Sequence, residues 1–144
     1  MAARARIIPD LVSDVLAFAA AVDHFDQAAG RALGLSRTDL KCAQALADGE
    51  GSTPAEIAER TGRSAEAVAG ALARLEDGGH VERRGELVAL TPDARAKIAE
   101  IYAPIEVAGT TLHRYGTEEL ATVKRFLRSA RTVYEREAAR IGEG

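Results

Sequence analysis

The sequence is poor in several residue types, and each scarcity excludes a class of structure. Its 144 residues include one cysteine, Cys42, so an intrachain disulfide is impossible. Aromatic residues make up only 4%, and alanine is abundant, which favours helices packed closely through small side chains. No stretch reaches the roughly 18 apolar residues of a membrane span, and Pro9 and Asp10 interrupt the apolar core that a signal peptide needs. We therefore expect a cytoplasmic protein without membrane contact.

A net positive charge is also absent, and lysine is scarce. The formal net charge is −3, and lysine occurs only at Lys41, Lys97 and Lys124, so arginine supplies most of the basic side chains. An overall excess of positive charge, the common footprint of nucleic-acid binding, is absent, and a local patch would have to provide it. Apolar residues make up 47%, so the chain is predicted to fold as one domain rather than to remain disordered.

The middle third of the chain carries the strongest local pattern. Thr53 is an expected N-cap, Pro54 occupies the first helical position, and Glu56 completes a capping box. Gly62 is placed to end this short helix in a tight turn, and Ser64 is placed to cap a second helix. Two capped helices joined by so short a turn are typical of a helix-turn-helix.

The residues that follow predict a small β-hairpin. The second helix has Val68, Leu72 and Leu75 on one face and ends at a pair of glycines. Residues 81–84 and 87–90 then have strand character, and the two-residue connection between them begins with glycine. The whole pattern predicts a winged helix-turn-helix, which places its second helix in a DNA major groove.

Long helices are predicted on both sides of this module. We expect helices over residues 10–33 and 37–48, a helix from Pro92 to about Tyr115 with a bend near Pro104, and a last helix capped by Thr117. The last helix has an apolar stripe that needs a partner: Leu120, Val123, Leu127, Ala130, Tyr134 and Ile141. The first helix of the same chain or the matching helices of a second copy would serve, and a homodimer through the two termini provides both.

Three stretches resemble the MarR family of bacterial transcription regulators: PAEIAERTG at 54–62, RLEDGGHVER at 74–83 and LTPDA at 90–94. The resemblance implies a mainly α fold with a small β-hairpin wing and an obligate dimer that binds a pseudo-palindromic operator, usually as a repressor. It implies dimerisation helices in residues 1–35 and 92–144, around a DNA-binding region at 36–91. It also implies a pocket where a small aromatic ligand binds and releases the DNA; His24, Tyr102 and His113 are the residues we assign to it.

The sequence departs from this family where bases would be read. Recognition helices of the family usually expose Ser, Thr, Arg, Gln or Asn, whereas this one exposes Ala65, Glu66 and Ala69, with Gly70 next to them. Alanine offers only a contact to a thymine methyl, and Glu66 can accept from a cytosine amino group but repels phosphates. The wing is about ten residues shorter than is common in the family. The predicted DNA-binding residues are Arg37, Arg63, Ser64, Ala65, Glu66, Ala69, Arg83 and Arg84.

The local charge keeps a second hypothesis open. Residues 53–90 contain five arginines and seven carboxylates, a net charge of −2. The alternative function is a winged-helix module whose specific DNA binding is weak or lost, and which acts through protein or ligand contacts. An enzyme is not indicated, because paired carboxylates, a Ser/His/Asp arrangement and a glycine-rich phosphate loop are all missing.

The remaining reactive residues have structural interpretations. Arg74 is expected to form an ion pair with Glu76, with Asp77 or with the preceding helix. Cys42 lies on a largely apolar helix face, where core packing is favoured over a redox role. The three histidines are scattered through the chain, so we predict neither a metal site nor a cofactor.

Overall fold

The computed structural model describes the backbone of residues 1–142 and the side chains of all of these except residues 107 and 108. The chain forms two compact units, one from Met1 to Ile101 and the other beginning at Tyr102. Within the described residues, none of the helices has both the length and the apolar character needed to cross a membrane.

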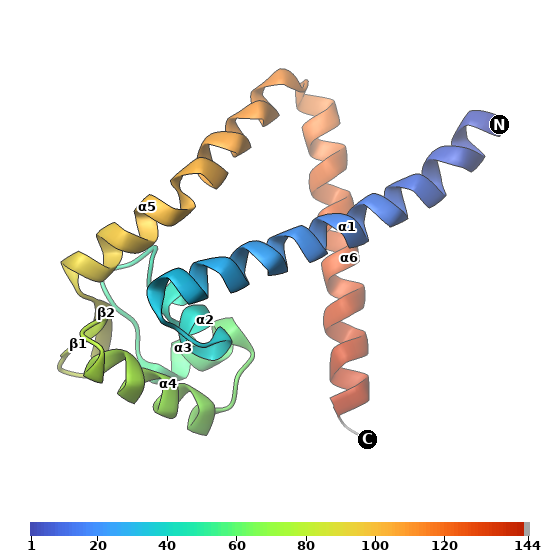
Figure 1. The fold of residues 1–144 in the computed structure, drawn as a ribbon. Helices are drawn as coiled ribbons and strands as arrows, with labels where there is room; N and C mark the ends of the chain where they lie inside the picture. Colours follow the sequence, from blue (N-terminus) through green and yellow to red (C-terminus); the bar gives the residue numbers. More distant parts are fainter. Residues whose placement is uncertain (143–144) are drawn as a thin grey trace. The chain divides into compact units, whose positions relative to one another are not determined.

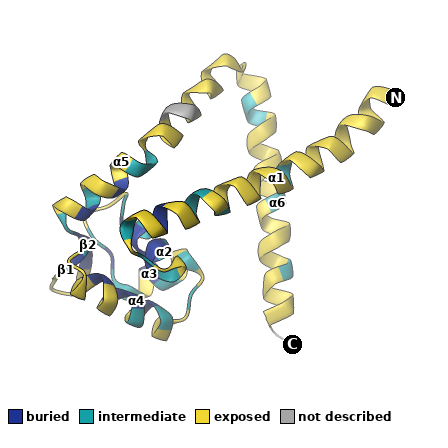
Figure 2. Cartoon of the chain, viewed as in Figure 1, coloured by how far each residue is buried: buried dark blue, intermediate teal, exposed yellow. Residues whose placement is uncertain are grey.

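The first unit contains the predicted winged helix-turn-helix. It comprises α1 (Ala2–Leu33), α2 (Arg37–Ala45), α3 (Pro54–Thr61), α4 (Ala65–Asp77), β1 (Val81–Arg84), β2 (Leu87–Leu90) and the start of α5 (Pro92–Gly109). Helices α2, α3 and α4 cluster together, with the hairpin following the end of α4 (Figure 1). The buried residues concentrate in this cluster (Figure 2), and the largest of them are Leu40, Leu46, Ile57, Leu72, Leu75 and Leu90. The predicted mainly α fold with a small hairpin is confirmed.

The predicted caps of the helix-turn-helix are confirmed. The Thr53 hydroxyl oxygen accepts a hydrogen bond from the Glu56 N–H at 3.3 Å, and the Ser64 hydroxyl oxygen accepts one from the Ala67 N–H at 3.1 Å. Such a cap contributes about 1 kcal/mol to the stability of a helix. Gly62 ends α3 with a φ of 67°, a conformation that glycine adopts without steric cost. These local signals fix where α3 ends and where α4 begins.

The hairpin has the predicted strands and turn. Strands β1 and β2 are antiparallel, Val81 is opposite Leu90 and Arg84 is opposite Leu87, so the turn consists of residues 85 and 86. An isolated bridge to the hairpin was not predicted: the Ser52 N–H donates to the Val88 carbonyl at 2.9 Å, and the Val88 N–H donates to the Ser52 carbonyl at 2.8 Å. A one-residue bridge leaves no period in the sequence, so pattern reasoning cannot detect it.

The connector between α2 and α3 is tied to its surroundings by two arginines. Arg95 of α5 donates to the carbonyl oxygens of Ala47 and Gly49 at 2.9 and 2.8 Å. Arg60 of α3 donates to the Ala45 carbonyl at 3.0 Å and to the Ser52 hydroxyl at 3.2 Å. The connector is therefore fixed to the helix that follows it and to the helix that follows the wing.

The predicted limits of the first two helices need correction. Helix α1 begins at Ala2 rather than at residue 10, with Pro9 inside it. Pro9 lies beyond the first turn, where proline removes one i→i−4 hydrogen bond, and the helix continues through it. Helix α2 ends at Ala45 rather than at residue 48, because the Leu46 N–H donates to the Ala43 carbonyl, three residues earlier, and tightens the last turn.

The last helices also differ from the prediction. Helix α5 ends at Gly109, and a separate 3₁₀ helix, η1 (Thr110–Arg114), covers the stretch that was expected to continue it towards Tyr115. Helix α6 (Thr117–Gly142) begins at Thr117 itself, so Thr117 is not its cap. The Leu120 N–H donates to the Gly116 carbonyl at 3.0 Å, which gives Gly116 the cap position.

Helices α1 and α6, each described within its own unit, are exposed along most of their length (Figure 2). Their exposed residues include large apolar side chains. In α6, Leu127 and Tyr134 of the predicted stripe are 56% and 62% exposed. In α1, Leu11 and Phe18 are 51% and 70% exposed. Contiguous exposed apolar surface of this kind usually marks an interaction site.

Candidate nucleic-acid interface

Helix α4 is amphipathic, and its burial defines which face meets solvent. Val68, Leu72 and Leu75 are at most 1% exposed and pack into the helical cluster. Ala65, Glu66 and Ala69 are exposed, as is the capping residue Ser64. The face expected to approach DNA is therefore the exposed face, and its three side chains supply two methyl groups and one carboxylate. Direct readout by hydrogen-bond donors is absent from these three positions.

Arg63 precedes this helix and lies beside its N-terminus. Its side chain is half-buried, and within residues 1–142 it makes no ion pair. The first amides of α4 also point outward at this end, and a helix N-terminus favours bound anions. The positive charge of Arg63 is thus available to bind a DNA phosphate without first breaking an ion pair within the described residues.

The wing arginines and Arg37 have acidic partners. Arg83 Nε lies 3.1 Å from a Glu76 carboxylate oxygen, and Arg84 Nε lies 3.1 Å from a Glu82 carboxylate oxygen. Arg37 of α2 lies 3.1 Å from Asp23 of α1. All three pairs are solvent-exposed, where an ion pair contributes about 1 kcal/mol or less. A phosphate can therefore replace these carboxylates at little cost.

Arg74 forms an ion pair as predicted, but the predicted partner is wrong. Its partner is not Glu76, Asp77 or a residue of the preceding helix α3 but Asp39 of α2, 35 positions away in the sequence. Arg74 Nε donates to both carboxylate oxygens at 3.1 Å, and Nη2 donates to one of them at 2.8 Å. Asp39 is 5% exposed, and the pair joins α2 to the recognition helix. Only the packing of α2 on α4 brings these two residues together.

Cys42 lies in the core of the same helix pair and is 0% exposed, as its apolar surroundings predicted. Burial raises the pKa of the Cys42 thiol above its ordinary value, and the Asp39 carboxylate raises it further. The positive charges of Arg63 and Arg74 act in the opposite direction and are the smaller effects. The thiol is therefore protonated and shielded at neutral pH, which disfavours a redox role.

We expect Cys42 to react with an alkylating thiol reagent only when the protein unfolds, since both its burial and its raised pKa suppress the thiolate. Because the folded state resists ionisation, stability is complete below the pKa of the unfolded thiol and decreases as the pH rises through the folded pKa. Mass spectrometry of modification against urea concentration measures the first effect. Rapid stoichiometric labelling of the folded protein at neutral pH would contradict it.

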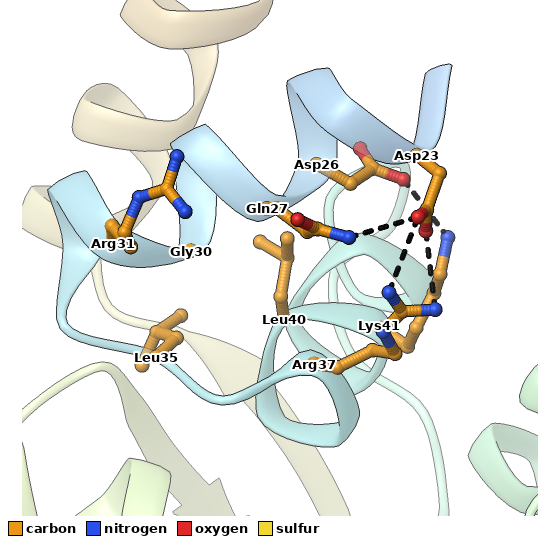
Figure 3. Close-up of a pocket in the computed structure, with 9 residues that line it drawn as sticks. All are labelled: Asp23, Asp26, Gln27, Gly30, Arg31, Leu35, Arg37, Leu40 and Lys41. Atoms are coloured by element: carbon orange, nitrogen blue, oxygen red, sulfur yellow. Dashed lines mark hydrogen bonds and ion pairs between the residues drawn. The ribbon is translucent and has the colours of Figure 1, made fainter. Parts of the chain in front are cut away.

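A cavity of about 200 Å³ lies between α1 and α2 (Figure 3). Asp23 binds Arg37 and accepts from Gln27, Asp26 binds Lys41, and Arg31 lies apart from these pairs. Drug-sized ligands usually occupy about 300–1,000 Å³ of mostly apolar space. This cavity is smaller, and most of the residues that line it have charged or amide side chains: Asp23, Asp26, Gln27, Gly30, Arg31, Leu35, Arg37, Leu40 and Lys41.

The predicted ligand residues do not line this cavity. His24 is exposed on α1, whereas Tyr102 and His113 belong to the second unit, so the predicted pocket stays a prediction. Among the described residues, no group of three or more His, Cys, Asp or Glu side chains is placed to hold a metal ion.

Comparison with known proteins identifies the fold and the family. Residues 33–89 match the family model described as MarR family. The chain is 34% identical over 126 residues to the uncharacterized HTH-type transcriptional regulator YcgE of Bacillus subtilis (strain 168), with 81% of each chain covered.

Two solved structures share this fold. One is the Mycobacterium tuberculosis MarR family protein Rv2887 in complex with DNA, with a TM-score of 0.52, 28% identity, and coverage of 74% of this chain and 85% of that one. The other is a MarR family protein from Bacillus stearothermophilus, with a TM-score of 0.64 at 17% identity and coverage of 90% and 96%. The chain belongs to the MarR family of winged helix-turn-helix transcriptional regulators, which are not enzymes.

Proposed function

We propose that this protein is a dimeric repressor that binds a pseudo-palindromic DNA operator in the cytoplasm. The observation that carries this proposal is the solvent-facing N-terminal turn of α4, which is capped by Ser64 and flanked by Arg63, an arginine without an ion pair among the described residues. The DNA complex of the related Rv2887 supports the same use of the fold.

The proposed interface has two phosphate-binding ends. Arg63 and the amides at the start of α4 form one end, and Arg83 and Arg84 of the wing form the other. Helix α4 has 13 residues and is therefore about 20 Å long, and it separates the first end from the wing that follows its C-terminus. Arg37 is a further candidate once a phosphate displaces Asp23. With few phosphate contacts, binding is expected to weaken steeply as the salt concentration rises.

Sequence selection rests on a small set of groups. The methyl groups of Ala65 and Ala69 suit thymine methyls, and Glu66 suits the amino group of cytosine. Small side chains also let the helix lie deep in the groove, so the shape and deformability of the DNA contribute to selection. We expect a modest preference for the operator over random DNA.

The dimer is proposed from the exposed apolar faces of α1 and α6. Each helix leaves large side chains in solvent that a second copy would bury. A two-fold dimer presents two recognition helices, which is the arrangement that a pseudo-palindromic operator requires. We further propose that a small aromatic ligand shifts the dimer to a state that releases the DNA, and that the release is what derepresses the regulated genes.

DNA binding is tested with the fragment upstream of the protein's own gene, measured by fluorescence anisotropy at low salt. Arg63→Ala is expected to lower the affinity about tenfold or more, because a charge-assisted phosphate contact is lost. The double variant Arg83→Ala with Arg84→Ala is expected to abolish binding under these conditions.

The matched control for these arginine variants is Arg131→Ala on α6, an exposed arginine with a carboxylate partner at 3.4 Å, which should leave affinity unchanged. A wild-type protein that shows no preference for this fragment over shuffled DNA at any salt concentration would contradict the proposal. The repressor role is checked separately by a reporter gene behind the same fragment, whose expression should rise when the regulator is deleted.

The alternative module without specific DNA binding draws its support from the wing. Both wing arginines already have carboxylate partners, and the region from 53 to 90 has a net charge of −2. The two hypotheses predict different footprints. A protected operator within the upstream fragment would exclude the alternative, whereas a stable protein partner without any protected DNA would favour it.

A further inference from the structure

The guanidinium of Arg74 occupies the space beside Gly70, one turn earlier on the recognition helix. A Cβ atom built at Gly70 would lie 3.3 Å from Arg74 Nη1, closer than an ordinary contact. Side chains on a helix lean towards its N-terminus, so residue 74 naturally covers the surface at residue 70. Glycine in a helix interior is less stable than alanine, yet a Cβ here would require Nη1 to move by a few tenths of an ångström.

Asp39 holds one edge of this guanidinium and leaves the other edge free. Nε and Nη2 donate to the Asp39 carboxylate, whereas Nη1 has no partner among the residues that the structure describes. The Arg74 side chain is 58% exposed although the Asp39 side chain is only 7% exposed. The charge is thus anchored from the protein interior while its outer edge faces solvent.

Arg74 lies at the border of the exposed face of α4. Glu66, Gly70 and Arg74 follow one another at intervals of four residues and form one ridge, and Leu75 beyond it is buried. When a helix enters a groove, side chains at the border of its exposed face meet the groove wall, which consists of phosphates. An arginine there adds the positive charge that Ala65, Glu66 and Ala69 do not supply.

We infer that Arg74 is a preorganised phosphate contact of the DNA-binding surface: Asp39 fixes its Nε and Nη2, Gly70 leaves room for it, and Nη1 donates to a DNA phosphate. The inference rests on the proposed function, since it requires that the protein bind duplex DNA. The arrangement reduces the entropic cost of contact, because a guanidinium that is already held loses little freedom when it binds. Asp39 acts as a positioning residue and does not touch the DNA.

The test compares the wild-type protein with the double variant Asp39→Asn with Arg74→Gln. This replacement keeps a hydrogen-bonding pair of similar shape and leaves the net charge unchanged, so only the specific cationic contact is removed. Binding to a duplex of arbitrary sequence is measured between about 50 and about 200 mM salt. The slope of log affinity against log salt is expected to fall by about 0.9 for each bound protomer.

The matched control is Glu135→Gln with Arg131→Gln on α6, which also removes an ion pair without changing the net charge, and its salt slope should equal that of the wild type. If the Asp39→Asn, Arg74→Gln variant folds and its salt slope equals that of the wild type, the inference is wrong. Arg74 would then have only the structural role of joining α2 to α4. A loss restricted to one DNA sequence would overturn the phosphate assignment in favour of a base contact. A wild-type protein that binds no duplex would instead refute the proposed function itself.

Gly70→Ala provides a second test that keeps both charges. Alanine favours the helix, so the melting temperature should stay the same or rise, whereas the displaced Nη1 should lower DNA affinity several-fold and reduce the salt slope. A lower DNA affinity without a lower melting temperature would therefore identify the lost contact. A Gly70→Ala protein with wild-type affinity and slope would contradict the inference even if the double variant failed to fold.

Discussion

Leu75→Ala is expected to lower the free energy of unfolding by about 3 kcal/mol, because it empties a fully buried site in the recognition helix. Leu75 is 0% exposed and lies near the C-terminal end of α4, shortly before the wing begins. The total stability of a domain is only about 5–15 kcal/mol, so a large part of it would be lost. DNA binding should weaken as well, although no side chain on the exposed face has changed.

Urea unfolding followed by circular dichroism measures this change, at one protein concentration because a dimer gains stability with concentration. The matched control is Leu87→Ala in the wing, a leucine that is 41% exposed, for which we expect a change of about 0.5 kcal/mol or less. Equal effects of the two replacements would show that the packing of α4 does not limit stability.

Leu127→Glu with Tyr134→Glu is expected to convert the protein to a monomer and to lower its operator affinity about 100-fold or more. Both side chains are more than half exposed in α6 and lie seven residues apart on its apolar stripe. Two buried carboxylates without partners oppose association strongly. The loss of affinity follows because two linked recognition helices bind a two-site operator far more tightly than one.

Sedimentation velocity measures the oligomeric state, and anisotropy measures affinity. Thr132→Glu with Ala139→Glu is the matched control, since it adds the same charges with the same spacing on the other side of α6, where both residues are exposed. A stripe variant that remains dimeric with wild-type affinity would place the dimer interface elsewhere.

The sequence predicted the features that depend on neighbouring residues. The caps at Thr53 and Ser64, the turn at Gly62 and the register of the hairpin are all set within a few positions, and each was confirmed. Local rules sufficed because each signal forms a hydrogen bond or a backbone conformation within one turn.

The features that were missed depend on distant residues or on small balances of energy. Asp39 meets Arg74 only after α2 packs on α4, and Ser52 meets Val88 only after the wing folds back. The start of α1 before Pro9 was missed because a proline signals a boundary without enforcing one. For the interface, the sequence located the candidate residues. Only the structure shows that the wing arginines are paired and that Arg63 makes no ion pair within residues 1–142.

The bridge between Ser52 and Val88 has a consequence for how a signal can reach the DNA. Ser52 is 3% exposed, its backbone is paired in both directions with the wing, and its hydroxyl accepts from Arg60 of α3. Arg95, near the N-terminal end of α5, also donates hydrogen bonds to two carbonyl oxygens of the connector. A winged helix-turn-helix held by these hydrogen bonds resists internal deformation, so a ligand would change its internal structure little. In the proposed dimer, a ligand would therefore change the spacing between the two winged helix-turn-helix regions. Regulation would act by making this spacing differ from the helical repeat of the DNA.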